Sequence, residues 1–250
     1  MGVEHKASNL VPDKKPPAKK TRCIKSGRLK WNRQWRGQRN KNPKLCIGTW
    51  NVKTLLKPGK MKELAEELTK TRLEIVALQE IRWSGNGVIK QKDFSLYYSG
   101  AKTQTGQAGI GFMGKIRDNV IGFEAVNDRI CKLRLKGKYN NVSLINICAP
   151  TEDKADTEQD KFYKELQQVI DQTPKSDTTL VLGDANAKIG KEDTYNEVSG
   201  KHTLHEYSNT NGEMLLEFAI GNNLTVMSTH FQHKKIHKGT WLAPDDIKSN

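Results

Sequence analysis

The sequence lacks the long apolar segments that membrane and secreted proteins carry. No stretch approaches the roughly 20 consecutive apolar residues that span a bilayer, and the amino terminus has no apolar core of the signal-peptide type. Cysteine is also scarce: Cys23, Cys46, Cys131 and Cys148 form no C-x-x-C pair, so neither a zinc site nor a disulfide framework is indicated. We therefore expect a soluble, intracellular protein with reduced thiols.

Positive charge is concentrated in one part of the chain. The net charge is +14, and residues 1–44 contain 14 of the 42 Lys and Arg residues but only 2 of the 28 acidic ones. This segment has almost no aliphatic periodicity to offset the entropy cost of ordering, so we expect a disordered basic arm. Its composition fits a solvated tail, a nuclear-localisation signal or a nucleic-acid-binding segment. If the arm binds nucleic acid, its tryptophan rings would stack on bases and its Lys and Arg side chains would contact phosphates. The candidate residues are Arg28, Lys30, Trp31, Arg33, Trp35, Arg36 and Arg39.

From residue 45 onward, short apolar runs alternate with amphipathic segments, which is typical of a mixed α/β architecture. Helices are predicted after Pro58, from Thr157 with a capping-box-like Asp160, and over residues 212–220 with Asn211 as the cap. Turn signals without a helix pattern predict an antiparallel meander over residues 95–150. Strands are expected at residues 45–52, 74–81, 95–100, 108–114, 119–126, 130–137, 142–150, 178–186 and 224–231.

Three of the expected strands end in polar side chains that a buried core would not contain. They deliver Asn51, Glu80, and Asp184 together with Asn186. Because ligands bind at the carboxyl ends of strands in open α/β sheets, these groups are predicted to converge. Carboxylate and amide oxygens suit Mg²⁺ or Mn²⁺ rather than zinc. Taken singly, each Asn or Asp also fits a turn, and Glu80 also fits an ion pair with Arg82 or Lys90.

The segments CIGTWNV, IVALQEIRW, NICAPTEDK and LVLGDANAKIG follow one another in an order and spacing that resemble the endonuclease/exonuclease/phosphatase superfamily. Within it, QEIRWSG, APTEDK, NGEMLLEFA and FQHKKIHKGTW resemble the endonuclease domain of RTE-type non-LTR retrotransposons. The resemblance covers about residues 45–250. It implies a four-layer α/β sandwich, with two mixed sheets face to face and helices outside. It also implies divalent-metal-dependent hydrolysis of phosphodiester bonds in nucleic acid, with DNA as the expected partner.

By this resemblance Glu80 is the main metal ligand, and Asn51 beside it orients the metal or the phosphate. Asp184 aligns or deprotonates the attacking water, while Asn186 holds the phosphate or positions Asp184. Such a set suits the chemistry, because a phosphodiester accumulates negative charge in the transition state. Cys148 stands where the family usually has a tyrosine that bonds the phosphate, which removes one donor and implies an effect of about 100-fold.

The family's site is completed by two later segments, similar to Q-I-D-H-V and S-D-H, and the sequence stops at Asn250 before either of them. We therefore expect a domain over residues 45–250 that lacks its C-terminal strands and has little activity, unless His205 or His230 replaces the missing histidine. Two alternatives stay open: a non-catalytic remnant that binds nucleic acid or chromatin, and hydrolysis of an inositol phosphate or phospholipid head group. The sequence indicates neither a membrane nor an obligate protein partner.

Overall fold

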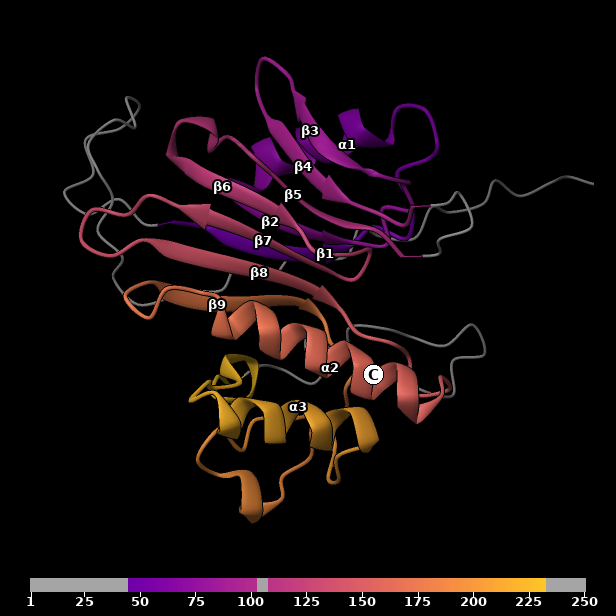
Figure 1. The fold of residues 1–250 in the computed structure, drawn as a ribbon, viewed down its shortest axis with the longest axis vertical. Helices are drawn as coiled ribbons and strands as arrows, with labels where there is room; N and C mark the ends of the chain where they lie inside the picture. Colours follow the sequence, from indigo (N-terminus) through magenta and orange to yellow (C-terminus); the bar gives the residue numbers. More distant parts are fainter. Residues whose placement is uncertain (1–44, 103–107, 233–250) are drawn as a thin grey trace, which may run out of the picture.

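The computed structural model describes residues 45–102 and 108–232, which form two β-sheets with helices on their outer faces (Figure 1). Sheet A has the strand order β1-β2-β5-β4-β3, and sheet B has the order β6-β7-β8-β9. The strands are β1 Ile47–Asn51, β2 Ile75–Gln79, β3 Asn86–Lys90, β4 Ser95–Ser99, β5 Ile110–Gly114, β6 Val120–Ala125, β7 Ile130–Leu135, β8 Val142–Cys148 and β9 Thr178–Asp184. The helices are α1 Lys60–Thr71, α2 Asp156–Asp171 and α3 Thr210–Gly221, with short 3₁₀ turns at η1 Arg117–Asn119, η2 Asp193–Tyr195 and η3 Met227–Thr229.

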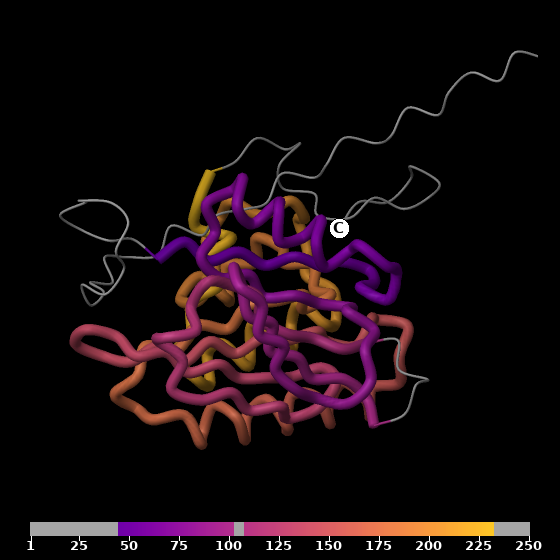
Figure 2. Tube along the Cα trace, turned by 90° about the horizontal axis from the view of Figure 1, so that it is seen from above, coloured from indigo at the N-terminus to yellow at the C-terminus, as the bar shows by residue number. Residues whose placement is uncertain are grey.

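The layers follow the order α1, sheet A, sheet B and α2, with α3 packed beyond α2 (Figure 1). Figure 2 shows these layers edge-on, with the indigo segment that contains α1 on one side and the salmon to orange segments of sheet B and α2 on the other. The strands of the pairs β1–β2 and β8–β9 are parallel, whereas the other paired strands are antiparallel, so both sheets are mixed. The expected four-layer α/β sandwich is confirmed.

Strand alternation supplies the core, because apolar side chains at every second position face the opposite sheet. The other faces of the two sheets pack against helices, which carry apolar side chains at helical spacing. The inter-sheet layer includes Ile75, Ala77, Phe112, Leu133, Leu144 and Leu182; the layer under α1 includes Leu64, Leu68, Val76 and Leu78; and the layer under α2 includes Ile145, Ile147, Phe162 and Leu166.

The structure corrects three predictions about strands. Residues 224–231 form no strand: Val226 makes an isolated bridge to Ser199, and the 3₁₀ turn η3 follows. The alternating Leu224 and Val226 instead pack against the small cluster beside α3. Strand β3 was not predicted, and the expected meander over residues 95–150 is divided between the two sheets, because β4 and β5 belong to sheet A and β6, β7 and β8 to sheet B.

Two predicted helix starts are also wrong. Helix α2 begins at Asp156 after Ala155, and no side chain caps it, so Thr157 and Asp160 form no capping box. The cap of α3 is Asn209, whose side chain accepts a hydrogen bond from the Gly212 N–H at 2.9 Å. Asn211 lies inside the helix and is buried.

Candidate active site

The carboxyl ends of three strands bring Asn51, Glu80 and Asp184 together. The Asn51 side chain joins them: its Nδ2 donates to Glu80 Oε1 at 2.6 Å and to Asp184 Oδ2 at 3.2 Å. Asn51 and Glu80 come from β1 and from the end of β2 in sheet A, whereas Asp184 ends β9 in sheet B. The site is therefore built across the two sheets, and one amide nitrogen lies within hydrogen-bond reach of both carboxylates.

Asn186 orients Asp184 through its backbone. The Asn186 N–H donates to Asp184 Oδ1 at 3.1 Å, while its Nδ2 donates to the Ala149 carbonyl at 2.7 Å. Both carboxylate oxygens of Asp184 thus accept a hydrogen bond, one from Asn186 and one from Asn51. The bond to Asp184 comes from the backbone of Asn186 and the bond to Ala149 from its side chain, so both roles implied for Asn186 stay predictions.

Asn211 is a supporting residue that the sequence did not reveal as such. It is 1% exposed, and its Nδ2 donates to the Asn186 and Pro150 carbonyls, each at 3.0 Å. Helix α3 is thereby attached to the loop that follows β9. The available signal was a polar residue in the first turn of a helix, and that signal also fits a cap.

The backbone around the site adopts conformations that side chains other than glycine rarely take. Lys53, Glu80, Arg82 and Asn186 have φ values of 61°, 56°, 62° and 48°. Immediately before Asp184, Gly183 has φ 134°, and a Cβ there would meet the Ile147 carbonyl oxygen at 2.0 Å. Left-handed residues cost about 1 to 3 kcal/mol each and gather at functional sites.

Two carboxylates, Glu80 and Asp184, carry the negative charge of the site. Arg82 Nη2 lies 3.5 Å from the Glu80 carboxylate, on a side chain that is 43% exposed, so solvent screens this pair. Glu80 therefore forms the ion pair with Arg82 that the sequence offered as an alternative, but this pair is weak and Glu80 also accepts the hydrogen bond from Asn51. Cys148, paired with Asp184 in the parallel register, is buried, and burial together with the negative charge of Asp184 raises the pKa of its thiol to about 12. The thiol is neutral, so the charged groups beside it include the two carboxylates and the Arg129 guanidinium, which donates to the Cys148 carbonyl at 3.2 Å.

The donor set fits a hard divalent cation. Within the described residues no group of three or more His, Cys, Asp or Glu side chains could hold a metal, which does not suit zinc. Mg²⁺ needs only one or two carboxylates and keeps several waters. Asn51 Oδ1 accepts the Lys53 N–H at 3.0 Å, so its nitrogen faces Glu80. The assignments of Glu80 and Asn51 as metal ligands stay predictions.

Within the described residues, neither candidate histidine forms a hydrogen bond or ion pair with Asn51, Glu80, Asp184 or Asn186. Burial and the neighbouring Lys188 lower the pKa of His205, which is therefore neutral at pH 7, while His230 is exposed and follows η3. The basic arm, with all seven expected nucleic-acid contacts from Arg28 to Arg39, lies outside the described residues. Within residues 45–102 and 108–232, none of the helices has the length and apolarity needed to cross a membrane.

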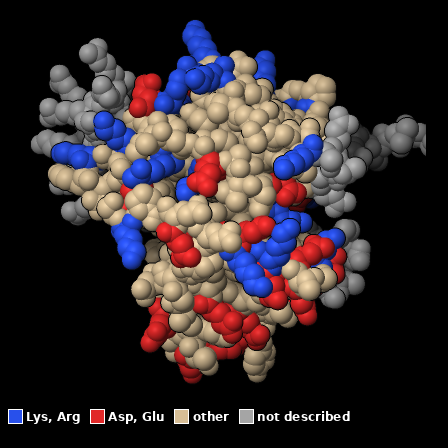
Figure 3. Space-filling view, in the orientation of Figure 1, with Lys and Arg blue, Asp and Glu red and all other residues tan. Residues whose placement is uncertain are grey.

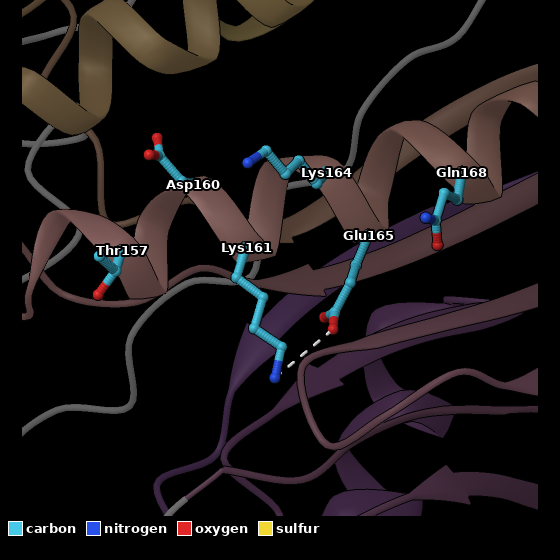
Figure 4. Close-up of a pocket in the computed structure, with 6 residues that line it drawn as sticks. All are labelled: Thr157, Asp160, Lys161, Lys164, Glu165 and Gln168. Carbon is cyan, nitrogen blue, oxygen red and sulfur yellow. Dashed lines mark ion pairs between the residues drawn. The ribbon is translucent and has the colours of Figure 1, made fainter.

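A separate surface depression of about 450 Å³ lies along α2. Its side chains are polar, and Lys161 and Glu165 point the same way and form a 3.9 Å ion pair (Figure 4). None of the residues that line it belongs to the strand ends described above. The depression is one solvated face of a helix, and the candidate chemistry lies elsewhere.

Comparison with known proteins decides the family. The family described as "Endonuclease/Exonuclease/phosphatase family" matches residues 48–231. The chain belongs to this family. Its name covers nucleases and phosphatases, which hydrolyse phosphate esters. The match includes Asn51, Glu80, Asp184 and Asn186.

The curated relatives are much longer than this chain. Craniofacial development protein 2 of Bos taurus is 33% identical over 202 residues, which is 80% of this chain and 33% of that protein. The protein of the same name from Tragulus javanicus is 28% identical over 266 residues, covering 96% of this chain and 46% of that protein. The chain spans less than half the length of these two relatives.

Two solved structures are similar at low identity. The endonuclease domain of TRAS1, a telomere-specific non-LTR retrotransposon, superposes with a TM-score of 0.49 at 16% identity and covers 76% of each chain. An AP endonuclease from Archaeoglobus fulgidus gives a TM-score of 0.49 at 15% identity, covering 71% of this chain and 70% of its own.

Proposed function

We propose that this domain hydrolyses phosphodiester bonds in nucleic acid, with DNA as the expected substrate, and depends on Mg²⁺ or Mn²⁺. The observation that carries the proposal is the Asn51 amide, which joins Glu80 of one sheet to Asp184 of the other at 2.6 and 3.2 Å. Two carboxylates held this close repel one another unless a cation or a donor lies between them. Family membership supports phosphate-ester hydrolysis as the reaction.

The contacts of each residue support the role that the resemblance to the family implies. Glu80 would hold the metal ion, which when bound neutralises charge that develops on the phosphate. Asp184, oriented through both of its oxygens, takes the proton from a water molecule whose oxygen attacks phosphorus. The bond between phosphorus and the leaving oxygen breaks, and that oxygen takes a proton from solvent. Asn51 and Asn186 add neutral donors that bring no further negative charge to the site.

The charge distribution supports an approach of nucleic acid away from α3. In Figure 3 acidic side chains gather at the lower end of the molecule, over α3 and its neighbouring loops, and basic side chains are more numerous toward the opposite end. A polyanion is repelled by the first surface and attracted by the second. We expect the binding strength to fall with added salt, because bound cations are released from the phosphates.

Plasmid nicking tests the proposal. Wild-type protein should nick supercoiled DNA with Mg²⁺ and stop when EDTA removes the metal, while Glu80→Gln and Asp184→Asn should each lower turnover by about 1000-fold or more. Glu165→Gln is the matched control, because it neutralises a carboxylate that lines the α2 depression and should leave nicking unchanged. Wild-type protein that nicks no faster than either site variant would rule the proposal out.

A second candidate function is binding without cleavage, which the composition of residues 1–44 favours. Under this alternative the arm alone supplies the affinity for nucleic acid, and it would also suit a nuclear location. Deleting residues 1–44 should then weaken DNA binding and flatten its dependence on salt concentration. Binding measured by fluorescence anisotropy that does not change on deletion would exclude a role for the arm.

A further inference from the structure

A pair of buried amides crosses the space between the two sheets. Gln79 on β2 and Asn146 on β8 are 1% and 0% exposed, and Gln79 Nε2 donates to Asn146 Oδ1 at 2.7 Å. Asn146 Nδ2 in turn donates to the Leu78 and Gly111 carbonyls of sheet A, each at 2.9 Å. Thr49 on β1 extends the chain of contacts through its hydroxyl, which donates to Gln79 Oε1 at 3.2 Å.

These amides interrupt an otherwise apolar layer. The side chains around them, such as Ala77, Leu144 and Leu182, belong to the inter-sheet core. Buried polar groups add little net stability, because they give up hydrogen bonds with water to make those in the protein. They do fix the relative position of the two sheets. Apolar packing is non-directional and permits small shifts of one sheet against the other, whereas a hydrogen bond requires a narrow range of distance and angle.

The network lies directly beneath the candidate site. Thr49 is two residues before Asn51, and Gln79 immediately precedes Glu80. On sheet B, Asn146 is paired with Leu182, two residues before Asp184. At a rise of about 3.3 Å per residue, the sheets are thus joined about 3 Å before Glu80 and about 7 Å before Asp184, measured along the strands.

We propose that Gln79 and Asn146 are positioning residues, which hold Asn51 and Glu80 of sheet A at the distance from Asp184 of sheet B that phosphodiester cleavage requires. This inference rests on the proposed function of the site. The reasoning is geometric: the carboxylates belong to different sheets, so no short stretch of backbone fixes their separation. A misplacement of about 1 Å at a reacting centre costs about 100-fold in rate.

Three variants separate positioning from stability. Gln79→Met and Asn146→Leu each leave the other amide with an unsatisfied buried group, so both should lower the urea midpoint. The double variant removes both amides and fills the space with apolar atoms, so its midpoint should rise above that of either single variant. It should stay below that of wild type, because the Leu78 and Gly111 carbonyls and the Thr49 hydroxyl still lose a partner. We expect turnover in the nicking assay to stay about 100-fold low in all three, with unchanged affinity for DNA. Turnover that recovers with the midpoint in the double variant would overturn the proposal.

A readout that needs no catalysis keeps this test separate from that of the proposed function. The side-chain NH₂ signals of Asn51 report its bonds to Glu80 and Asp184 in a ¹⁵N–¹H NMR spectrum, and they are assigned by their loss in Asn51→Ala. We expect these signals to shift in the double variant. Ser143→Ala is the control, because it removes a fully buried hydroxyl from the same strand, bonded to Asp177 at 2.8 Å on the other face of sheet B.

The outcomes are distinguishable. Asn51 signals that shift in the double variant but not in Ser143→Ala support positioning, even where wild-type protein does not nick DNA and the proposed function itself fails. Asn51 signals that coincide in wild type and the double variant overturn the inference, whatever the nicking assay shows.

Discussion

Replacing Asn211 by alanine should destabilise the protein more than replacing Asn209, the helix cap. The Asn211 side chain is 1% exposed and donates to the Asn186 and Pro150 carbonyls at 3.0 Å. Its loss removes two hydrogen bonds worth about 1 kcal/mol each and leaves two largely buried acceptors without that donor, so we expect a cost of about 2 to 4 kcal/mol. Truncating a cap such as Asn209 costs about 1 kcal/mol. Asn209 also accepts from the Lys188 N–H at 2.8 Å and donates to Glu152 at 2.9 Å, but these groups are half-buried or exposed, so their loss adds less than that of the buried Asn211 bonds.

Urea denaturation of four variants distinguishes the two roles. Serine is a good helix cap, but its hydroxyl has one proton and cannot donate to two carbonyls. We expect Asn209→Ser to keep most of the free energy of unfolding that Asn209→Ala loses, whereas Asn211→Ser should be as unstable as Asn211→Ala. The opposite pattern, with serine tolerated at 211 and not at 209, would refute the reasoning and return Asn211 to the role of cap.

Two predictions concern the dependence of stability on pH. The pKa of the Cys148 thiol is raised to about 12 from a usual 9.0, so above pH 9 the unfolded chain loses its proton first; stability should fall by about 1.4 kcal/mol per pH unit up to about pH 12. Urea titrations of Cys148→Ala at several pH values should give a free energy of unfolding that falls less steeply above pH 9, by that amount per pH unit. A fall as steep as that of wild type would exclude the thiol as its cause. Arg134 lowers the pKa of Asp177, to which it donates at 2.7 and 2.9 Å, so this carboxylate contributes stability above the usual Asp pKa that is lost as the pH falls through the lowered value. Asp177→Asn should therefore cost about 2 kcal/mol at pH 7 and flatten the acid side of the thermal-stability profile, and a profile parallel to that of wild type would contradict this.

The strand ends of the site were predictable from sequence because the signal is local. A run such as LVLGD buries its apolar residues and must present Asp184 where the strand stops, and the same holds for Asn51 and Glu80. Their convergence follows once the two sheets stack with the carboxyl ends of β1, β2 and β9 at the same end of the sandwich. Which atom faces which was not predictable, because the Asn51 amide orientation depends on the Lys53 N–H and on a carboxylate from the other sheet.

The remaining differences depend on tertiary contacts. The segment SNTNG offers two asparagines at the start of α3, and the sequence alone does not say that Asn209 caps the helix while Asn211 reaches the loop after β9. Likewise Leu224 and Val226 alternate as in a strand, yet they satisfy that pattern against α3 without a neighbouring strand. A local pattern thus predicts which side chains are buried. It does not predict which element covers them, because that depends on contacts between segments far apart in the sequence.

The site shows how a sandwich can place two like charges near one another. Glu80 and Asp184 come from different sheets, and the apolar layer between the sheets is non-directional. Directional contacts therefore have to fix the separation, and two of them lie close to the carboxylates: the Asn51 bridge and the Gln79–Asn146 pair. Because each of these contacts joins a strand of sheet A to a strand of sheet B, a substitution at either one changes the position of both carboxylates relative to each other. We expect such substitutions to reduce activity by more than their effect on stability explains.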